Sequence, residues 1–152
     1  MNEVTKLPSW RHAAHELLRN FRYGELVSLE WLEAKFGMPS LSESEMLTAE
    51  QFKERQFEWL ANIEAFKDYL LKEHQVCLQS VRGRGYRWVP PHEQTTVAIK
   101  EFEREAGRVF RNTGNKLRNL RHTELTSEQR RANMDATAKL TALAGMTRTA
   151  LR

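Results

Sequence analysis

Apolar residues recur with helical spacing along most of this chain. In its first part, two stretches place their apolar side chains on one face, and a serine precedes each of them: Ser9 and Ser28. Serine is a preferred helix cap, because its hydroxyl accepts a hydrogen bond from a backbone N–H of the first turn. The pattern therefore predicts a helix over residues 10–21 and a shorter one over residues 29–36.

A longer amphipathic stretch follows, from about Thr48 to His74. Thr48 and Gln51 form a capping-box pattern, in which each side chain can satisfy a backbone N–H of the first turn. Apolar residues then recur on one stripe: Phe52, Trp59, Ile63, Phe66 and Leu70. We expect a break near residues 54–56, which would leave the second part as the third helix of a three-helix core.

A short β-hairpin is the next predicted element. Residues 76–81 and 86–89 read as strands, and they flank two glycines, Gly83 and Gly85, that permit a tight turn. The Pro-Pro pair at residues 90–91 ends the hairpin, because proline lacks the N–H that a strand uses for pairing.

The rest of the chain predicts two further helices. One runs from about Gln94 to Leu120, and the other starts at Thr126, which forms a second capping-box pattern with Gln129. Two helices joined by a short loop indicate a helical hairpin. We expect a homodimer through these C-terminal helices.

Three helices followed by a glycine-turned hairpin is the order of a winged helix. The predicted fold class is therefore mainly α with a small β-hairpin: a winged helix-turn-helix followed by a C-terminal helical hairpin. We expect a flexible N-terminal tail over residues 1–9, a winged helix domain over residues 10–91 and a basic helical appendage over residues 92–152.

Charge is distributed unevenly over these parts. The chain has a formal net charge of +4, but residues 1–92 carry 12 Lys and Arg against 13 Asp and Glu, a net of −1. Residues 93–152 carry 12 against 7, a net of +5. Basic surfaces attract nucleic acid, so the last part of the chain is the stronger electrostatic candidate for that partner.

The hairpin carries the most specific motif. Residues 81–87 read Val-Arg-Gly-Arg-Gly-Tyr-Arg, which resembles the wing signature Val-Arg-Gly-x-Gly-Tyr-Arg of OmpR-type response-regulator output domains. The first two predicted helices are similar to those of that family. In both, a Leu-Leu pair, a Gly, a Val-Ser and a Leu follow one another in the same order. The resemblance covers residues 10–89 without the family's receiver domain, so we do not expect control by phosphorylation.

This resemblance implies a DNA-binding site. It makes residues 57–72 the recognition helix, in which Ala65, Asp68 and Tyr69 stand where that family commonly has basic residues. A wing of this kind lays its basic side chains against the phosphate backbone or in the minor groove. The implied contacts to DNA come from the third helix and the wing: Asn62, Lys67, Lys72, Arg82, Arg84 and Arg87.

A second basic feature lies on the long helix after the hairpin. Arg104, Arg108 and Arg111 fall at i, i+4 and i+7, and therefore share one helical face. Such a stripe can neutralise phosphates, so these three residues belong to the predicted DNA-binding site.

Other chemistry finds little support in the residues. The five histidines show no metal-ligand spacing, the single cysteine gives no cysteine cluster, and no catalytic or phosphate-binding motif stands out. We therefore expect no enzymatic activity, no metal and no cofactor. No apolar run approaches the length of a membrane span, and we expect a cytoplasmic protein without a membrane partner.

Two functions remain open. The first is a winged-helix protein that binds double-stranded DNA, as a small transcriptional regulator or a replication accessory factor, with a mobile element as a candidate source. The alternative is a protein-interaction module that docks on a polymerase, a nuclease or another protein of the transcription or replication machinery. An acidic face on the third helix, in place of one positive surface shared with the wing, would favour the alternative.

Overall fold

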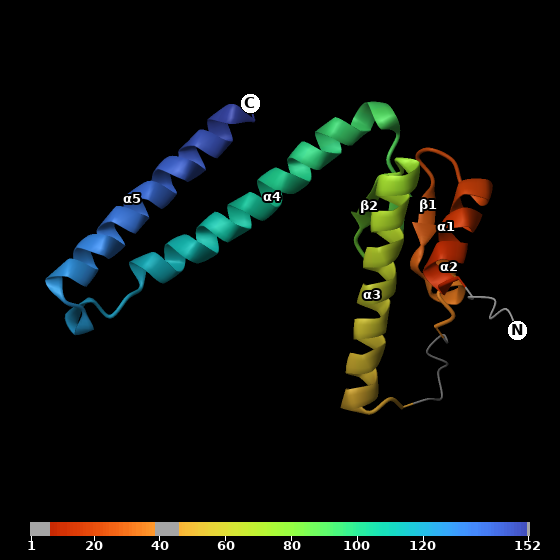
Figure 1. The fold of residues 1–152 in the computed structure, drawn as a ribbon, viewed down its shortest axis with the longest axis horizontal. Helices are drawn as coiled ribbons and strands as arrows, with labels where there is room; N and C mark the ends of the chain where they lie inside the picture. The colour runs from red at the N-terminus through yellow and green to blue at the C-terminus, as the bar shows by residue number, and fades with distance from the viewer. Residues whose placement is uncertain (1–6, 39–45, 152) are drawn as a thin grey trace, which may run out of the picture. The chain divides into compact units, whose positions relative to one another are not determined.

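A computed structural model of the chain describes residues 7–38 and 46–151, which divide into two compact units. The first unit extends to Gln94, and the second starts at Thr95, within the helix α4. The elements follow one another in this order (Figure 1): α1 Ser9–Asn20, β1 Leu26–Ser28, α2 Leu29–Lys35, α3 Ala49–His74, β2 Leu78–Val81, β3 Gly85–Trp88, α4 Pro91–Arg118, the 3-10 turn η1 His122–Glu124 and α5 Ser127–Ala150.

The fold is mainly α with one small antiparallel sheet, and this part of the prediction is confirmed. Residues 1–6 of the predicted tail lie outside the described residues. The predicted domain boundary between residues 91 and 92 stays a prediction, since two compact units need not fold independently.

The first unit is built around one hydrophobic core, with α3 as its central element. Ile63, Phe66 and Leu70 of α3 are fully buried, and they belong to one cluster with apolar side chains from α1, α2 and the three strands. The other buried members are Ala13, Ala14, Leu17, Val27, Leu32, Phe36, Met38, Val76, Leu78 and Trp88. Because the α3 residues recur at i, i+3 and i+7, one face of the helix enters the core and the opposite face lies in solvent.

Side-chain caps determine where several helices begin. The predicted caps at Ser28, Thr48 and Thr126 all form, and each accepts a hydrogen bond from a backbone N–H of its first turn. Ser9 is not a cap, contrary to the prediction. It is the first residue of α1, and its hydroxyl donates to the Phe36 carbonyl at 3.2 Å, which joins α1 to the end of α2.

α3 is a single helix of 26 residues, so the predicted break near residues 54–56 is wrong. These positions hold Glu, Arg and Gln, which are all good helix formers, and neither Gly nor Pro interrupts them. Arg55 also lies 3.7 Å (Nη2 to Oε2) from Glu33 of α2, which ties the first half of α3 to the rest of the unit.

The sheet has a third strand that the sequence pattern did not predict. β1 pairs antiparallel with β3, with Val27 opposite Tyr86, and the strand order is β1-β3-β2. The hairpin strands β2 and β3 pair with Val81 opposite Gly85. A strand of three residues is too short to show a clear alternation, and only its pairing with β3 defines it.

Gly85 lies where β1 and β3 come closest. Its φ angle is +145°, and a Cβ at this position would lie only 2.0 Å from the carbonyl oxygen of Val27. Gly83, in the turn, also has a positive φ of +73°, but its surroundings are open. Only glycine therefore fits at residue 85, whereas residue 83 is constrained by its backbone angle alone.

We expect Gly85→Ala to lower the free energy of unfolding of the first unit much more than Gly83→Ala does. A side chain on left-handed backbone costs about 1–2 kcal/mol, and at Gly85 the new Cβ also collides with β1. Chemical denaturation followed by circular dichroism measures both losses. Equal losses for the two variants would contradict the close approach of β1 and β3.

The second unit consists of α4 from Thr95 onward, η1 and α5. The Asn133 side-chain amide donates to the Leu117 carbonyl at 3.2 Å, and so connects α5 to the end of α4. Of the described residues 95–151, only Val97 and Gly114 are buried. This unit therefore lacks a hydrophobic core of the kind that the first unit has.

Candidate nucleic-acid interface

The turn between β2 and β3 presents two arginines to solvent. Arg82 and Arg84 are exposed on either side of Gly83, and neither forms an ion pair with any described residue. The Arg84 N–H donates to the Val81 carbonyl at 3.0 Å, and the Arg84 carbonyl accepts from the Leu29 N–H at 3.2 Å. The backbone of the turn is thus held in place while both guanidinium groups stay available to an anion.

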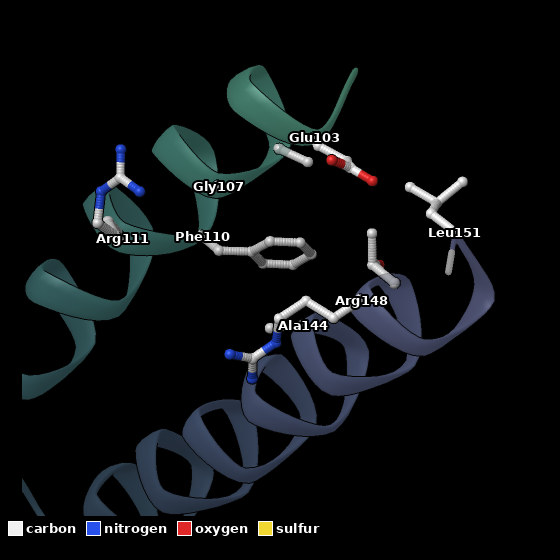
Figure 2. Close-up of a pocket in the computed structure, with 9 residues that line it drawn as sticks. Glu103, Gly107, Phe110, Arg111, Ala144, Arg148 and Leu151 are labelled. Atoms are coloured by element: carbon white, nitrogen blue, oxygen red, sulfur yellow. The ribbon is translucent and has the colours of Figure 1, made fainter. Parts of the chain in front are cut away.

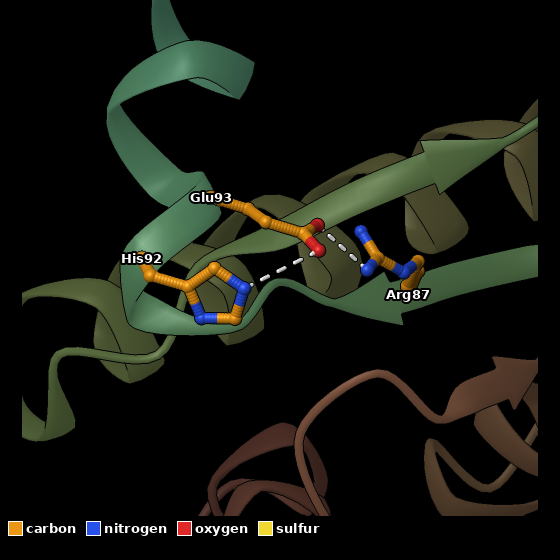
Figure 3. A network of polar contacts seen from close by, with 3 residues as sticks. All are labelled: Arg87, His92 and Glu93. Carbon is orange, nitrogen blue, oxygen red and sulfur yellow. Dashed lines mark hydrogen bonds and ion pairs between the residues drawn. The ribbon is translucent and has the colours of Figure 1, made fainter.

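Arg87, the third predicted wing residue, already has an acidic partner. Its Nη2 donates to Oε2 of Glu93 at 2.7 Å, where β3 leads into α4. Nε2 of His92 lies 3.7 Å from Oε1 of the same carboxylate (Figure 3). Because this ion pair has to break before Arg87 can bind a phosphate, Arg82 and Arg84 are the stronger wing candidates.

The two lysines predicted on α3 are also paired, both with acids of the same helix. Nζ of Lys67 lies 3.8 Å from Oε1 of Glu64, and Nζ of Lys72 lies 2.8 Å from Oδ1 of Asp68. The hydrogen bond to Asp68 raises the pKa of Lys72. Since α3 carries six acidic and four basic residues, its own charge opposes the approach of a phosphate backbone.

The three predicted contacts on α3 do not gather on one face. Asn62, Lys67 and Lys72 follow at five-residue steps, which turn by roughly 140° each around a helix. Tyr69 packs against α1, with its ring 5.6 Å from that of Trp10. The structure therefore brings no positive surface together on this helix.

Exposed apolar side chains occupy the solvent face of α3 instead. Phe57 is 71% exposed, Leu60 53% and Leu71 45%, and the carboxylates of Glu64 and Asp68 lie on the same face. The helical spacing of Phe57, Leu60 and Leu71 could be seen in the sequence. The buried face of α3 shows the same spacing, however, and spacing does not say which face enters the core.

In the second unit, basic side chains line one face of α4. Lys100 lies at i−4 from Arg104 and extends the predicted set, which defines a basic stripe: Lys100, Arg104, Arg108 and Arg111. All four are exposed, and none is paired with a carboxylate within the part of the chain that the structure describes. The sequence prediction omitted Lys100, although its spacing from Arg104 could have identified it.

A cavity of about 560 Å³ lies between α4 and α5 within the second unit. The Phe110 ring lies between the two helices, and small residues, among them Gly107 and Ala144, line the space around it (Figure 2). Arg111, from the end of the basic stripe, also borders this cavity.

Comparison with known proteins adds no function. No protein-family model matches the chain, and no curated protein or solved structure shows significant similarity to it. Within residues 7–38 and 46–151, no three His, Cys, Asp or Glu side chains are grouped to hold a metal ion. None of the described helices combines the length and the apolar character that crossing a membrane requires.

Tyr86 provides a spectroscopic probe of the contact between β3 and α3. Burial, and after it the negative charge of Glu64, raises the pKa of the Tyr86 phenol, and Nζ of Lys67 lies 5.5 Å from the ring centre. An absorbance titration of tyrosinate should show a late step that disappears in Tyr86→Phe. The control Tyr23→Phe, which removes an exposed tyrosine, should retain that step.

The same shift predicts a loss of stability at high pH. The pKa of Tyr86 in the folded state lies above the unfolded value of about 10. The contribution of the Tyr86 phenol to the free energy of unfolding is therefore complete below that pH, and it is lost as pH rises through the folded-state pKa. Glu64→Gln should move the late step to lower pH. A late step that persists in Tyr86→Phe would contradict the assignment.

Proposed function

We propose that this protein binds double-stranded DNA mainly through the phosphate backbone, with the basic stripe of α4 as the principal contact. The proposal rests on four basic side chains that share one exposed face without an acidic partner among the described residues. Phosphate contacts supply most sequence-independent affinity, because each neutralised phosphate releases condensed counterions. Arg82 and Arg84 add a second, smaller contact.

We also propose that the first unit is a winged helix-turn-helix, a fold that suits DNA binding. The element order α1, β1, α2, α3, β2, β3 and the strand order β1-β3-β2 suit that fold, with residues 82–84 as the wing turn. The resemblance of residues 81–87 to the wing of OmpR-type output domains points the same way. On this proposal the wing lies against the backbone or in the minor groove.

We do not propose that α3 recognises the DNA sequence through contacts to base edges. Phosphate contacts position a protein on DNA, whereas contacts to base edges specify the sequence. Lys67 and Lys72 are paired with acids, and apolar residues occupy the solvent face of α3. Low sequence selectivity follows, and it suits a replication accessory factor better than a transcriptional regulator that has to find one operator.

Location and assembly follow from the same proposal. A protein that binds DNA works in the compartment that holds the DNA, so we propose a cytoplasmic location. We also propose a homodimer through the C-terminal helices, since two copies raise the affinity for one duplex by avidity.

Fluorescence anisotropy with a labelled duplex at several salt concentrations tests the proposed DNA contact. Arg104→Ala/Arg108→Ala should weaken binding at low salt and reduce the log–log salt slope by about 1.8, since each phosphate contributes about 0.9. Arg82→Ala/Arg84→Ala should also weaken binding. The effect of Arg87→Ala should be smaller, because Glu93 already neutralises that charge.

The matched control is Lys67→Ala/Lys72→Ala, which removes the same charge from α3. This variant should keep the salt slope of the parent chain. The proposal fails if the α3 variant lowers the slope as much as the α4 variant, or if the parent chain does not bind duplex DNA at low salt.

A second candidate function is the docking of a protein partner on α3. Exposed apolar patches bordered by polar groups mark interaction sites. Phe57 and Leu60 lie next to each other on the solvent face of α3, and Leu71 lies on the same face beyond Glu64 and Asp68. A basic amphipathic helix suits this surface, because its apolar stripe would cover the patch while its cations reach the carboxylates. A protein of the transcription or replication machinery is the partner class that we propose.

A photo-crosslinking residue in place of Phe57 tests this surface in cells. We expect a dominant protein adduct, which Leu60→Asp/Leu71→Asp should abolish without changing DNA affinity. The same crosslinker in place of Asp135 on α5 serves as the control and should not form that adduct. Absence of an adduct, or an adduct that survives both aspartates, would remove α3 as a docking site.

A further inference from the structure

The second unit contains two long helices that do not bury each other's apolar residues. α5 has no buried residue among those described, and six large apolar side chains of this unit are exposed: Phe102, Val109, Leu120, Met134, Leu143 and Met146. Helices in proteins obtain most of their stability from packing of an apolar face. These helices therefore require a further apolar surface to pack against.

α4 carries an exposed apolar stripe that is distinct from its face toward α5. Phe102 is 53% exposed and Val109 57%, and their seven-residue spacing places them within about 20° of one line along the helix. Phe110, which lines the cavity against α5, lies roughly 80° away from that line. Leu120, the second residue after the helix ends, is also exposed.

Two opposite charges lie along one edge of this stripe, at equal distances from its middle. Glu105 and Lys116 are exposed, unpaired within the described residues, and equally distant from the point between Phe110 and Arg111. Both lie roughly 40–60° from the Phe102 line, on the side away from Phe110. A two-fold axis at that midpoint would place Glu105 of one helix at the height of Lys116 of an antiparallel copy, on the same edge.

We infer that a second copy of this chain covers the apolar stripe, with the two α4 helices antiparallel and centred between residues 110 and 111. This inference rests on the homodimer that we propose, and it specifies the contact. Phe102 packs beside the end of the other α4 and its Leu120, and the two Val109 side chains lie near the midpoint. Two Glu105–Lys116 ion pairs between the copies set the register.

This arrangement leaves the DNA contact accessible. Lys100, Arg104, Arg108 and Arg111 lie roughly 160–240° around the helix from Phe102, which is the opposite side of α4. One helix therefore contacts its copy with one face and phosphates with the other. The dimer and DNA binding can be tested separately for the same reason.

Sedimentation equilibrium of the full chain tests the dimer contact. The parent should be dimeric at micromolar concentration, and Phe102→Asp should be monomeric at the same concentration. The control Phe57→Asp changes an even more exposed phenylalanine on α3 and should stay dimeric. Circular dichroism checks that each variant retains its helices.

Charge reversal tests the register independently of the apolar contact. Glu105→Lys and Lys116→Glu should each raise the dimer dissociation constant about tenfold, because two attractive pairs become repulsive, and the double reversal should restore it. A monomeric parent, or a dimeric Phe102→Asp, overturns the inference. Failure of the double reversal to restore the dimer overturns the antiparallel register.

The DNA-binding proposal has its own readout in this experiment. Arg104→Ala/Arg108→Ala should remain dimeric. If that variant is dimeric and binds DNA as tightly as the parent chain does, the proposed function fails while the dimer contact stands. If Phe102→Asp is monomeric and still binds DNA with a reduced affinity, both the contact and the function are supported.

Discussion

Three buried side chains set the rotation of α3, and the surface chemistry of the first unit follows from that rotation. Ile63, Phe66 and Leu70 enter the core, so the opposite face has to meet solvent. That face carries Phe57 and Glu64 instead of unpaired cations. Turning α3 to present another face would expose these three side chains to water, at about 1.5–3 kcal/mol for each one.

Four basic side chains without a described acidic partner share one face of α4, in a unit that has no hydrophobic core. α4 offers a face toward α5, an apolar stripe and the basic stripe, and the last two lie on opposite sides. In the first unit, by contrast, Arg87, Lys67 and Lys72 are paired with neighbouring carboxylates, and of the basic residues predicted there only Arg82 and Arg84 of the turn have no described acidic partner. On the proposed function, the charge imbalance between the two parts of the sequence separates a basic surface for DNA on α4 from a more acidic first unit.

Features that depend on neighbours in sequence could be predicted, and features that depend on distant contacts could not. The caps at Ser28 and Thr126 bond to backbone groups three residues further along the chain, and the glycines of the hairpin predict its turn. The strand β1 exists through its pairing with β3 at Gly85, which no local pattern shows. For the candidate site, the helical spacing of the α4 arginines was sufficient to predict that they share one face of the helix. The pairing of Arg87 with Glu93 was not visible, because it depends on the path of the chain from β3 into α4.

On the proposed function, DNA lies against the basic stripe of α4 and the wing turn and not against the solvent face of α3. A titration of the ¹⁵N-labelled protein with a duplex of arbitrary sequence, followed by NMR, tests it directly. The proposed function predicts that the side-chain Nε–H signals of Arg104, Arg108, Arg82 and Arg84 shift on binding. The backbone amide signals of residues 57–71 should keep their chemical shifts. The largest shifts on α3, with the α4 arginines unchanged, would contradict it.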